Sequence, residues 1–492
     1  METAIQPDQD QHQLQFPHWN FASRVAFRFW FVYFGLYCLS TQILTALLPL
    51  PKVEIPDPST FWPMRPIVLW TAIHIFRLSK PPAYADTGSG DKTFDWVLVF
   101  CLLLFAVLAA AIWSILDRKR QNYITLHKWF RLAIRLFLAG QMITYGLSKA
   151  VPLQMPFPYL TRLLTPYGNF SPMGVLWASI GSSPAYEIFA GCAELLGGIL
   201  LIFPRTTALG ALVCVADMIQ VFMLNMTYDV PVKLLSFQLL LLALFLLAPD
   251  LKRLVSFFLL NRATEPSSQP LLFATRRANR FAFAAQIVFG VWLLGMNGYG
   301  SWVSWFDYGG GQPKSPLYGI WEVDQQLIDG QVRSPLLTDS GRWRRAIFDI
   351  PNRMAFQRID DSFAGYAASI NVKDKTIALT SDTDKNWKAD FSFQRVVPDQ
   401  LTLDGDMDGH KTLLQLKLVD RNHFLLVNRA STGFQSSRST AEPDLGAPTS
   451  QERAGYWRSE PIAVQARRDN NPSRQCALGA NCSECDEPIP RV

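Results

Sequence analysis

Long apolar stretches fill most of the chain before residue 305, and shorter alternating runs follow them. A helix needs about 20 apolar residues to cross roughly 30 Å of hydrocarbon. Stretches long enough to cross occur at 26–50, 94–116, 127–150, 184–203, 205–227, 231–249 and 281–303. We therefore predict an α-helical integral membrane bundle with about seven transmembrane helices. The stretch 65–76, RPIVLWTAIHIF, is too short to cross and predicts an interfacial helix in the first external loop.

The pattern changes after a linker at 306–317, which contains GGGQPKS. From 318 to 430, apolar and polar residues alternate in runs from YGIWEV to HFLLVNR, separated by turn-forming segments such as DGDMDGH. Alternation with a period of two is typical of strands with one buried face. This region predicts a soluble all-β domain, either a small barrel or a sandwich. The polar, Pro- and Ser-rich remainder, 431–492, predicts a disordered tail.

Basic residues beside the apolar stretches predict the orientation. They cluster in two places, 117–131 and 252–280, and the positive-inside rule puts both in the cytoplasm. An uncleaved cytoplasmic segment then occupies 1–25, and two helices with their external loop occupy 26–120. A cytoplasmic loop and the seventh helix occupy 256–305, so the β domain is expected outside the cytoplasm.

Composition narrows the function classes. The net charge of +6 is modest and the basic residues follow the topology, so we expect a lipid bilayer, and no nucleic acid, as partner. Of only six His, just His74 and His127 lie near apolar stretches, which argues against bis-histidine haem or copper within the helices. The tail motif CSEC lacks a second pair of ligands, so no metal site is predicted.

Two acidic residues fall at mid-membrane depth. Counting about 1.5 Å per helical residue places Glu194 roughly 15 Å and Asp217 roughly 18 Å into the bilayer. A charge there costs at least about 2.5 kcal/mol, so it usually faces a partner, a cavity or a proton path. We expect at least one of the two carboxyls to hold a proton at neutral pH, because burial and a second carboxyl nearby both disfavour ionisation.

Other polar residues predict a cleft around these acids that opens to the outside. Gln141 and Gln238 fall in the middle third of their helices. Gathered near the outer ends are Tyr145, Lys149, Asn225, Asp229 and Lys233. Glu187 lies roughly 5 Å deep, and Lys149 is its expected counter-ion. Polar side chains in helical bundles also serve purely as interhelical contacts, an alternative that stands for Gln141 and Gln238 in particular.

The stretch 127–255, within a four-helix unit predicted at 121–255, resembles the DoxX family of bacterial membrane proteins. The residues that carry the resemblance are Arg131, Gly140, Lys149, the run Glu194–Gly198 (ELLGG) and the basic turn after Phe203–Pro204. It implies an inner-membrane accessory or subunit of a redox system for quinones or for thiol and sulfur compounds, with redox partner subunits and a quinone as cofactor. The chain departs from that plan by its additional helices and its β domain.

The β domain resembles a lipocalin at two places. Gly319 and Trp321, in YGIWEV, are similar to the Gly-x-Trp that opens such a barrel. The last recognisable strand ends at Arg429, the kind of residue that stacks over such a Trp. A sandwich with Trp321 simply in its core is the alternative.

Two functions fit these features. The first is that of an accessory or subunit of a membrane oxidoreductase. In it, Glu194, Asp217 and Lys149 take up and release protons. Its pocket for a quinone-like lipophile is predicted to include Gln141, Tyr145, Glu187 and Gln238. The second function is not catalytic: the helices bind or move a small lipophilic molecule, and the β domain receives it in a barrel cavity.

Overall fold

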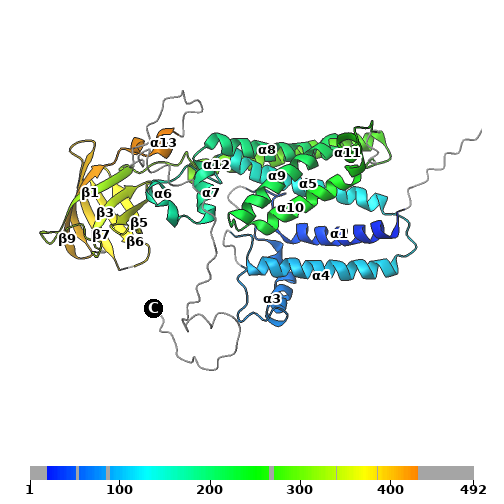
Figure 1. The fold of residues 1–492 in the computed structure, drawn as a ribbon, viewed down its shortest axis with the longest axis horizontal. Coiled ribbons are helices and arrows are strands. Elements are labelled where there is room, and N and C mark those ends of the chain that lie inside the picture. The colour runs from blue at the N-terminus through cyan, green and yellow to red at the C-terminus, as the bar shows by residue number, and fades with distance from the viewer. Residues whose placement is uncertain are drawn as a thin grey trace, which may run out of the picture. The chain divides into compact units, whose positions relative to one another are not determined.

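The computed structural model describes residues 19–50, 55–84, 89–264, 271–339, 341–384 and 386–429. The predicted disordered tail and most of the predicted cytoplasmic segment lie outside these residues. Apolar helices make up the first part of the described chain, and an antiparallel β-barrel makes up the last part (Figure 1).

Two long helices come first. Helix α1 (Phe21–Ser40) begins where the Asn20 side chain accepts a hydrogen bond from Ser23 N, and it packs along α4 (Thr93–Leu116). Between them, the predicted interfacial segment forms α3 (Met64–His74), whose eleven residues are too few to cross a membrane.

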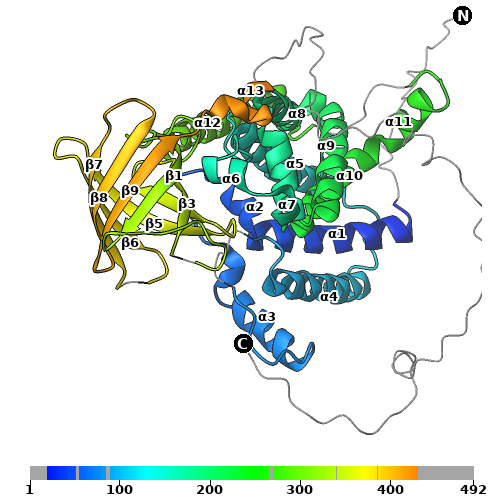
Figure 2. The same cartoon turned by 60° about the vertical axis from the view of Figure 1, so that its left-hand side comes forward.

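The predicted four-helix unit is formed by α5, α8, α9 and α10, which lie side by side (Figures 1 and 2). The bounds of these helices are Ile124–Ala150, Pro184–Ile202, Thr207–Thr227 and Lys233–Leu247. A further long helix, α12 (Arg276–Asp307), packs against α5 and α8.

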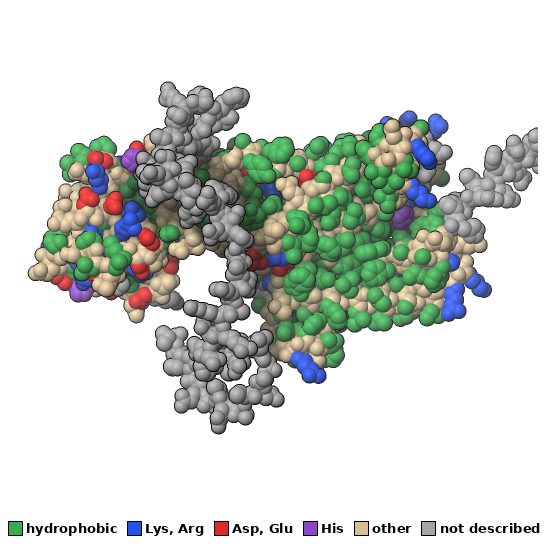
Figure 3. Space-filling model, in the orientation of Figure 1, with side chains coloured by type: hydrophobic (Ala, Val, Ile, Leu, Met, Phe, Trp, Pro, Cys, Tyr) green, Lys and Arg blue, Asp and Glu red, His purple; other side chains and the backbone are tan. Residues whose placement is uncertain are grey.

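Five helical stretches in the described residues are long and apolar enough to cross a membrane. They are Thr93–Leu116, Pro184–Ile202, Pro204–Thr227, Lys233–Phe258 and Arg276–Asp307. The other two predicted crossings, α1 and α5, reach 20 and 27 residues, but α1 carries two basic side chains and α5 carries five. The count of seven therefore stays a prediction. Figure 3 shows a broad hydrophobic band over the helices, with Lys and Arg gathered at the end where α4 ends and α11 lies.

Glycines bring the backbones of α5 and α8 into direct contact. A Cβ added at Gly191 would lie 2.6 Å from Gly146 O, and one added at Gly146 would lie 2.7 Å from Leu195 N. Neither position can hold a larger residue without moving backbone. Small residues are what allow helices in membranes to approach this closely, and the contact fixes the register of α5 against α8.

Eight strands close into a barrel because β1 pairs with both β3 and β9 (Figure 2). The strands are β1 (Gly319–Ile328), β3 (Trp343–Phe348), β4 (Arg353–Arg358), β5 (Phe363–Asn371), β6 (Thr376–Ser381), β7 (Lys388–Gln394), β8 (Gln400–Met407) and β9 (His410–Leu418). A two-residue strand, β2 (Gln331–Val332), adds to the edge of β1. Between the two predicted architectures, the structure thus selects the barrel over the sandwich.

Aromatic and aliphatic side chains fill the barrel interior. Trp321 is fully buried, and its Nε1 donates to Leu317 O at 2.9 Å. Trp343 and Phe356 stack with their ring centroids 3.4 Å apart. The inward-facing residues of all eight strands belong to one hydrophobic cluster, which leaves the barrel core packed by its own side chains.

The prediction of a last strand ending at Arg429 is wrong. Strand β9 ends at Leu418, and the run HFLLVNR continues instead into the short helix α13 (Leu425–Arg429). A turn of 3-10 helix intervenes, started by Asp420, whose side chain accepts from Asn422 N. The guanidinium that lies over Trp321 belongs to Arg395, 5.3 Å from the ring centroid.

Three short helices were not predicted: α6 (Leu160–Leu164), α7 (Pro172–Gly181) and α11 (Leu251–Phe258). Helix α6 connects to the barrel, since Leu160 packs against Ile320 and Ile347 and its backbone N–H donates to Asp349 Oδ2 at 2.8 Å. Burial raises the pKa of Asp349 above its ordinary value, although the hydrogen bond from Leu160 opposes the shift.

Candidate functional site

A buried ion pair joins α5 and α8 inside the four-helix unit. Lys149 Nζ, from α5, contacts both carboxylate oxygens of Glu194, from α8, at 2.7 and 2.8 Å. Only 7% of Lys149 and 3% of Glu194 is exposed. The glycine contacts set the register of these antiparallel helices, because a Cβ at Gly191 would meet Ala150 N and one at Gly146 would meet Leu195 N. Lys149 and Glu194 both lie between these two contacts, so their side chains can meet.

This geometry corrects the expected pairing of Lys149 with Glu187. Counting residues from the helix ends puts Lys149 near the level of Glu187, but its ammonium contacts Glu194 instead. Glu187 is 1% exposed and accepts from Met155 N at 2.9 Å through Oε1. Its second oxygen is buried with no hydrogen-bond partner among the described residues.

Asp217, from α9, lines the same cavity as the ion pair. Its Oδ2 is buried and has no hydrogen-bond partner among the described residues. An unpartnered carboxylate oxygen in low dielectric costs free energy unless a proton, a water molecule or a ligand satisfies it. Asp217 therefore offers an open hydrogen-bonding position beside the Lys149–Glu194 pair.

The cavity between α5, α8, α9 and α10 has a volume of about 280 Å³. Lys149 is its one cationic lining residue among those described, against the three carboxyl groups of Glu187, Glu194 and Asp217. Most of the remaining lining is apolar, and it includes Tyr186 and Phe189, which are 45% and 69% exposed on the bundle surface. We call this space the acidic cavity. It combines apolar walls with a few ionisable groups, as binding sites for small molecules do.

The predicted pocket residues separate into two groups. Tyr145 and Glu187 line the acidic cavity, whereas Gln141 and Gln238 are not among its lining residues. Gln141 Nε2 donates to Gln42 O at 3.0 Å, and Gln238 Nε2 donates to the Tyr33 hydroxyl at 2.6 Å. Both glutamines thus connect helices, as the alternative of interhelical contacts expects, and their part in a lipophile pocket stays a prediction.

The described residues hold no group of three or more His, Cys, Asp or Glu side chains arranged to bind a metal ion. The three carboxyls of the acidic cavity come from two helices, Glu187 and Glu194 from α8 and Asp217 from α9. This arrangement suits hydrogen bonding and proton exchange with a molecule inside the cavity.

Sequence reasoning missed two buried arginines. Arg28 is 2% exposed and donates to the Tyr123 hydroxyl, Ser114 Oγ and Asp117 O. Arg135 is 7% exposed and donates to Gln286 and Thr207. Their position inside helices was a usable signal, because an arginine in an apolar span needs specific acceptors.

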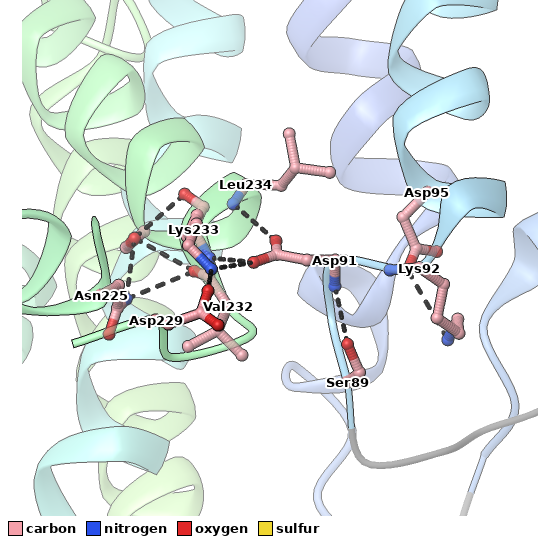
Figure 4. Close-up of polar contacts among 10 residues, drawn as sticks. Ser89, Asp91, Lys92, Asp95, Asn225, Asp229, Val232, Lys233 and Leu234 are labelled. Carbon is pink, nitrogen blue, oxygen red and sulfur yellow. Dashed lines mark hydrogen bonds and ion pairs between the residues drawn. The ribbon is translucent and has the colours of Figure 1, made fainter. Parts of the chain in front are cut away.

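A polar cluster near the start of α10 was predicted only in part. Asp91 accepts hydrogen bonds from Lys233 N and Leu234 N at 2.8 and 2.9 Å, and so caps α10 from the loop before α4 (Figure 4). The Lys233 ammonium lies 2.8 Å from Asp229 and 3.9 Å from Asp91. Asp229 and Lys233 were expected to gather here, but no local pattern pointed to Asp91.

Comparison with known proteins places the chain in a family. No family model matches the chain, and no solved structure matches it. YwoB of Bacillus subtilis (strain 168), described as an uncharacterized protein, is 34% identical over 124 residues. That match covers 25% of this chain and 79% of YwoB. The chain belongs to the same family as YwoB. Because YwoB is uncharacterized, membership of its family names no reaction, and the site itself must supply the functional argument.

Proposed function

We propose that this protein is a DoxX-like protein of the bacterial inner membrane whose four-helix unit binds a quinone-like lipophilic molecule as an accessory of a membrane redox system. The observation that carries the proposal is the acidic cavity. It contains the Lys149–Glu194 pair and the unpartnered oxygen of Asp217 inside apolar helices. Buried ionisable groups that line a cavity are retained mainly where they act.

The size of the acidic cavity supports a small polar headgroup as its occupant. Its volume of about 280 Å³ lies near the lower limit, about 300 Å³, of small-molecule sites. A long apolar tail would have to leave the cavity, and the exposed rings of Tyr186 and Phe189 supply an apolar surface where it could do so.

The residues have separable tasks in this proposal. Reduction of a quinone consumes two electrons, which a redox partner would supply, and two protons. Asp217 and Glu194 are the groups that hold and release protons toward the bound carbonyl oxygens. Lys149 orients the Glu194 carboxylate and offsets its charge.

A second candidate is binding or movement of a lipophilic molecule without chemistry. The apolar walls of the acidic cavity support it equally well. The packed interior of the β-barrel does not favour a ligand there, so in this version the binding is confined to the helices, and the lipocalin-like barrel serves as a folded external domain.

The test is to purify the full chain from membranes, identify extracted lipophilic molecules, and measure quinone reduction with thiosulfate or a thiol as donor. Glu194→Gln and Asp217→Asn are the informative variants. Asp229→Asn is the matched control, because it makes the same change at a side chain that is 81% exposed. We expect the first two to lose at least about a hundredfold in turnover, the scale of a general acid or base, and the control to retain it.

The outcomes separate the two candidates. A wild-type protein with neither turnover nor bound quinone would refute the redox proposal. Bound lipophile without turnover, lost in Asp217→Asn, would favour the second candidate.

A further inference from the structure

A second cavity lies beside the acidic cavity and has a different character. It measures about 370 Å³, is open on one side, and is lined by α2 (Gln42–Thr45), α5, α12 and residues that follow α2, from Ala46 to Leu50 and at Ile55. None of its described lining residues is charged. Its polar lining includes Gln42, Thr144, Ser148, Asn297, Ser301 and Ser304. We call it the neutral cavity.

Two serine hydroxyl groups of the neutral cavity have no hydrogen-bond partner among the described residues. Thr144 Oγ1 lies 3.0 Å from Asn297 Oδ1, and Ser148 Oγ donates to Tyr145 O. Ser301 and Ser304, in contrast, make no side-chain hydrogen bond to another described residue. Lipid cannot satisfy polar groups, whereas a polar cavity of this size has room for several water molecules. The lining thus indicates water as the occupant.

Tyr145 lies between the neutral cavity and the acidic cavity. Its side chain lines both cavities. Tyr145 belongs to α5, the helix that also carries Lys149. The Lys149 ammonium lies 5.7 Å from the centroid of the Tyr145 ring. The Tyr145 ring therefore borders the neutral cavity and lies beside the buried charges.

We propose that the neutral cavity is a hydrated vestibule, and that water and protons reach the Lys149–Glu194 pair from it by passing Tyr145. A proton taken from water in the vestibule binds a carboxylate oxygen of Glu194 or Asp217, and no electron moves in this step. Use of that proton by a bound ligand rests on the proposed function, but access through the vestibule does not.

Thiol labelling tests the hydration of the vestibule. Ser301→Cys and Ser304→Cys are made in the full chain, reconstituted in liposomes, and treated with a cationic, membrane-impermeant methanethiosulfonate. The control is Val291→Cys on the same helix, where the side chain is 65% exposed on the apolar bundle surface. Peptide mass spectrometry reads each position, so the native cysteines can stay in place.

We expect the two serine positions to react at least about tenfold faster than position 291, because a thiol in hydrocarbon neither ionises nor meets the reagent. Equal labelling rates at all three positions would refute the proposal that the neutral cavity is hydrated.

Carbodiimide labelling of Glu194 tests the route past Tyr145. Tyr145→Ala should increase modification of Glu194 by a water-soluble carbodiimide several-fold, and Tyr145→Phe, which keeps the ring, should leave it close to wild type. Modification by a lipophilic carbodiimide serves as the control for an intact acidic cavity. Unchanged water-soluble labelling in Tyr145→Ala, with lipophilic labelling retained, would exclude this route. Neither readout needs redox turnover, so the vestibule and the proposed function can fail independently.

Discussion

At the scale of single residues, Lys149 and Glu194 pair because burying either charge without the other would cost much free energy. A buried charge without a partner is far more expensive than a buried pair, although the pair itself adds little net stability. The two contacts of 2.7 and 2.8 Å use both carboxylate oxygens of Glu194. Replacing both residues together should therefore destabilise the protein less than replacing one of them.

We accordingly predict that Lys149→Met lowers the free energy of unfolding by about 3–5 kcal/mol, the usual cost of orphaning a buried charge. The double variant Lys149→Met, Glu194→Gln should recover most of that loss. Thermal unfolding of the purified protein in detergent, followed by circular dichroism, measures both. A double variant less stable than Lys149→Met would contradict the interpretation.

Asp349 gives a pH dependence in the barrel. Its pKa is raised from the ordinary value of 3.8 mainly by burial, so ionisation costs the folded state more than the unfolded state. This destabilisation is absent below the ordinary pKa and develops as pH rises through the raised pKa. Asp349→Asn stays neutral and keeps an acceptor for Leu160 N. We expect wild type and variant to show similar protection of β1 and β3 amides near pH 4, and the variant to be better protected at pH 7.

Hydrogen exchange at matched pH makes this comparison, since the intrinsic exchange rates cancel between the two proteins. If the ratio of amide protection between wild type and Asp349→Asn stays constant across that pH range, ionisation of Asp349 does not destabilise the folded barrel.

The depth argument located Glu194 and Asp217 correctly beside one cavity, because a carboxyl in an apolar span is conspicuous from sequence alone. It failed for the partner of Lys149, because counting residues treats helices as parallel rods with a common starting level. It also could not separate Gln141 and Gln238 from the cavity, since a glutamine that connects helices and one that faces a ligand occupy the same kind of position in the sequence.

At the scale of elements, the small residues of α8 determine how closely it approaches α5. Gly191 faces the backbone of α5, including Ala150 N and Gly146 O. Gly295 in α12 has no atom within 4 Å of the position a Cβ would take. The two glycines look alike in sequence, but only the first lies in a close helix contact.

Gly191→Ala should therefore destabilise the protein by about 1–3 kcal/mol, the range for overpacking, and should move Lys149 away from Glu194. Gly295→Ala should cost nothing, because alanine favours helix by about 1 kcal/mol over glycine. Thermal midpoints of the two variants test this. A Gly191→Ala protein as stable as Gly295→Ala would mean that α5 and α8 do not meet at these glycines.

Elements with strong local periodicity were predictable, and elements defined by distant contacts were not. The long apolar stretches became α4, α8, α9, α10 and α12, and the alternating runs became the barrel strands. The same alternation fits a sandwich, and only the pairing of β1 with β9 decides for the barrel. Helix α6 was missed because its five residues are too few for a periodic signal, and its position depends on Leu160 meeting the barrel.

At the scale of the whole molecule, the distribution of charge supports an orientation that no contact in the structure tests. Lys and Arg gather at one end of the hydrophobic band (Figure 3). Seven crossings with cytoplasmic basic loops predict that the β-barrel lies outside the cytoplasm.

Of the reporters fused after Gln312, only one that works outside the cytoplasm should thus be active. Alkaline phosphatase fused there should be active, and green fluorescent protein exported unfolded through the same route should stay dark. Fusions after Arg120 should give the reverse result. Cytoplasmic activity after Gln312 would refute seven crossings and force a reassignment of α1, α3 or α5.

The cap that Asp91 places on α10 has a consequence for biosynthesis. Asp91 precedes Lys233 by 142 residues, so its carboxylate has left the ribosome long before the amide groups that it binds. When α10 is made, the acceptor for its first amides is therefore already present in the chain. A chain translated without its first hundred residues would lack that acceptor, and α10 would have to begin without the cap that Asp91 supplies.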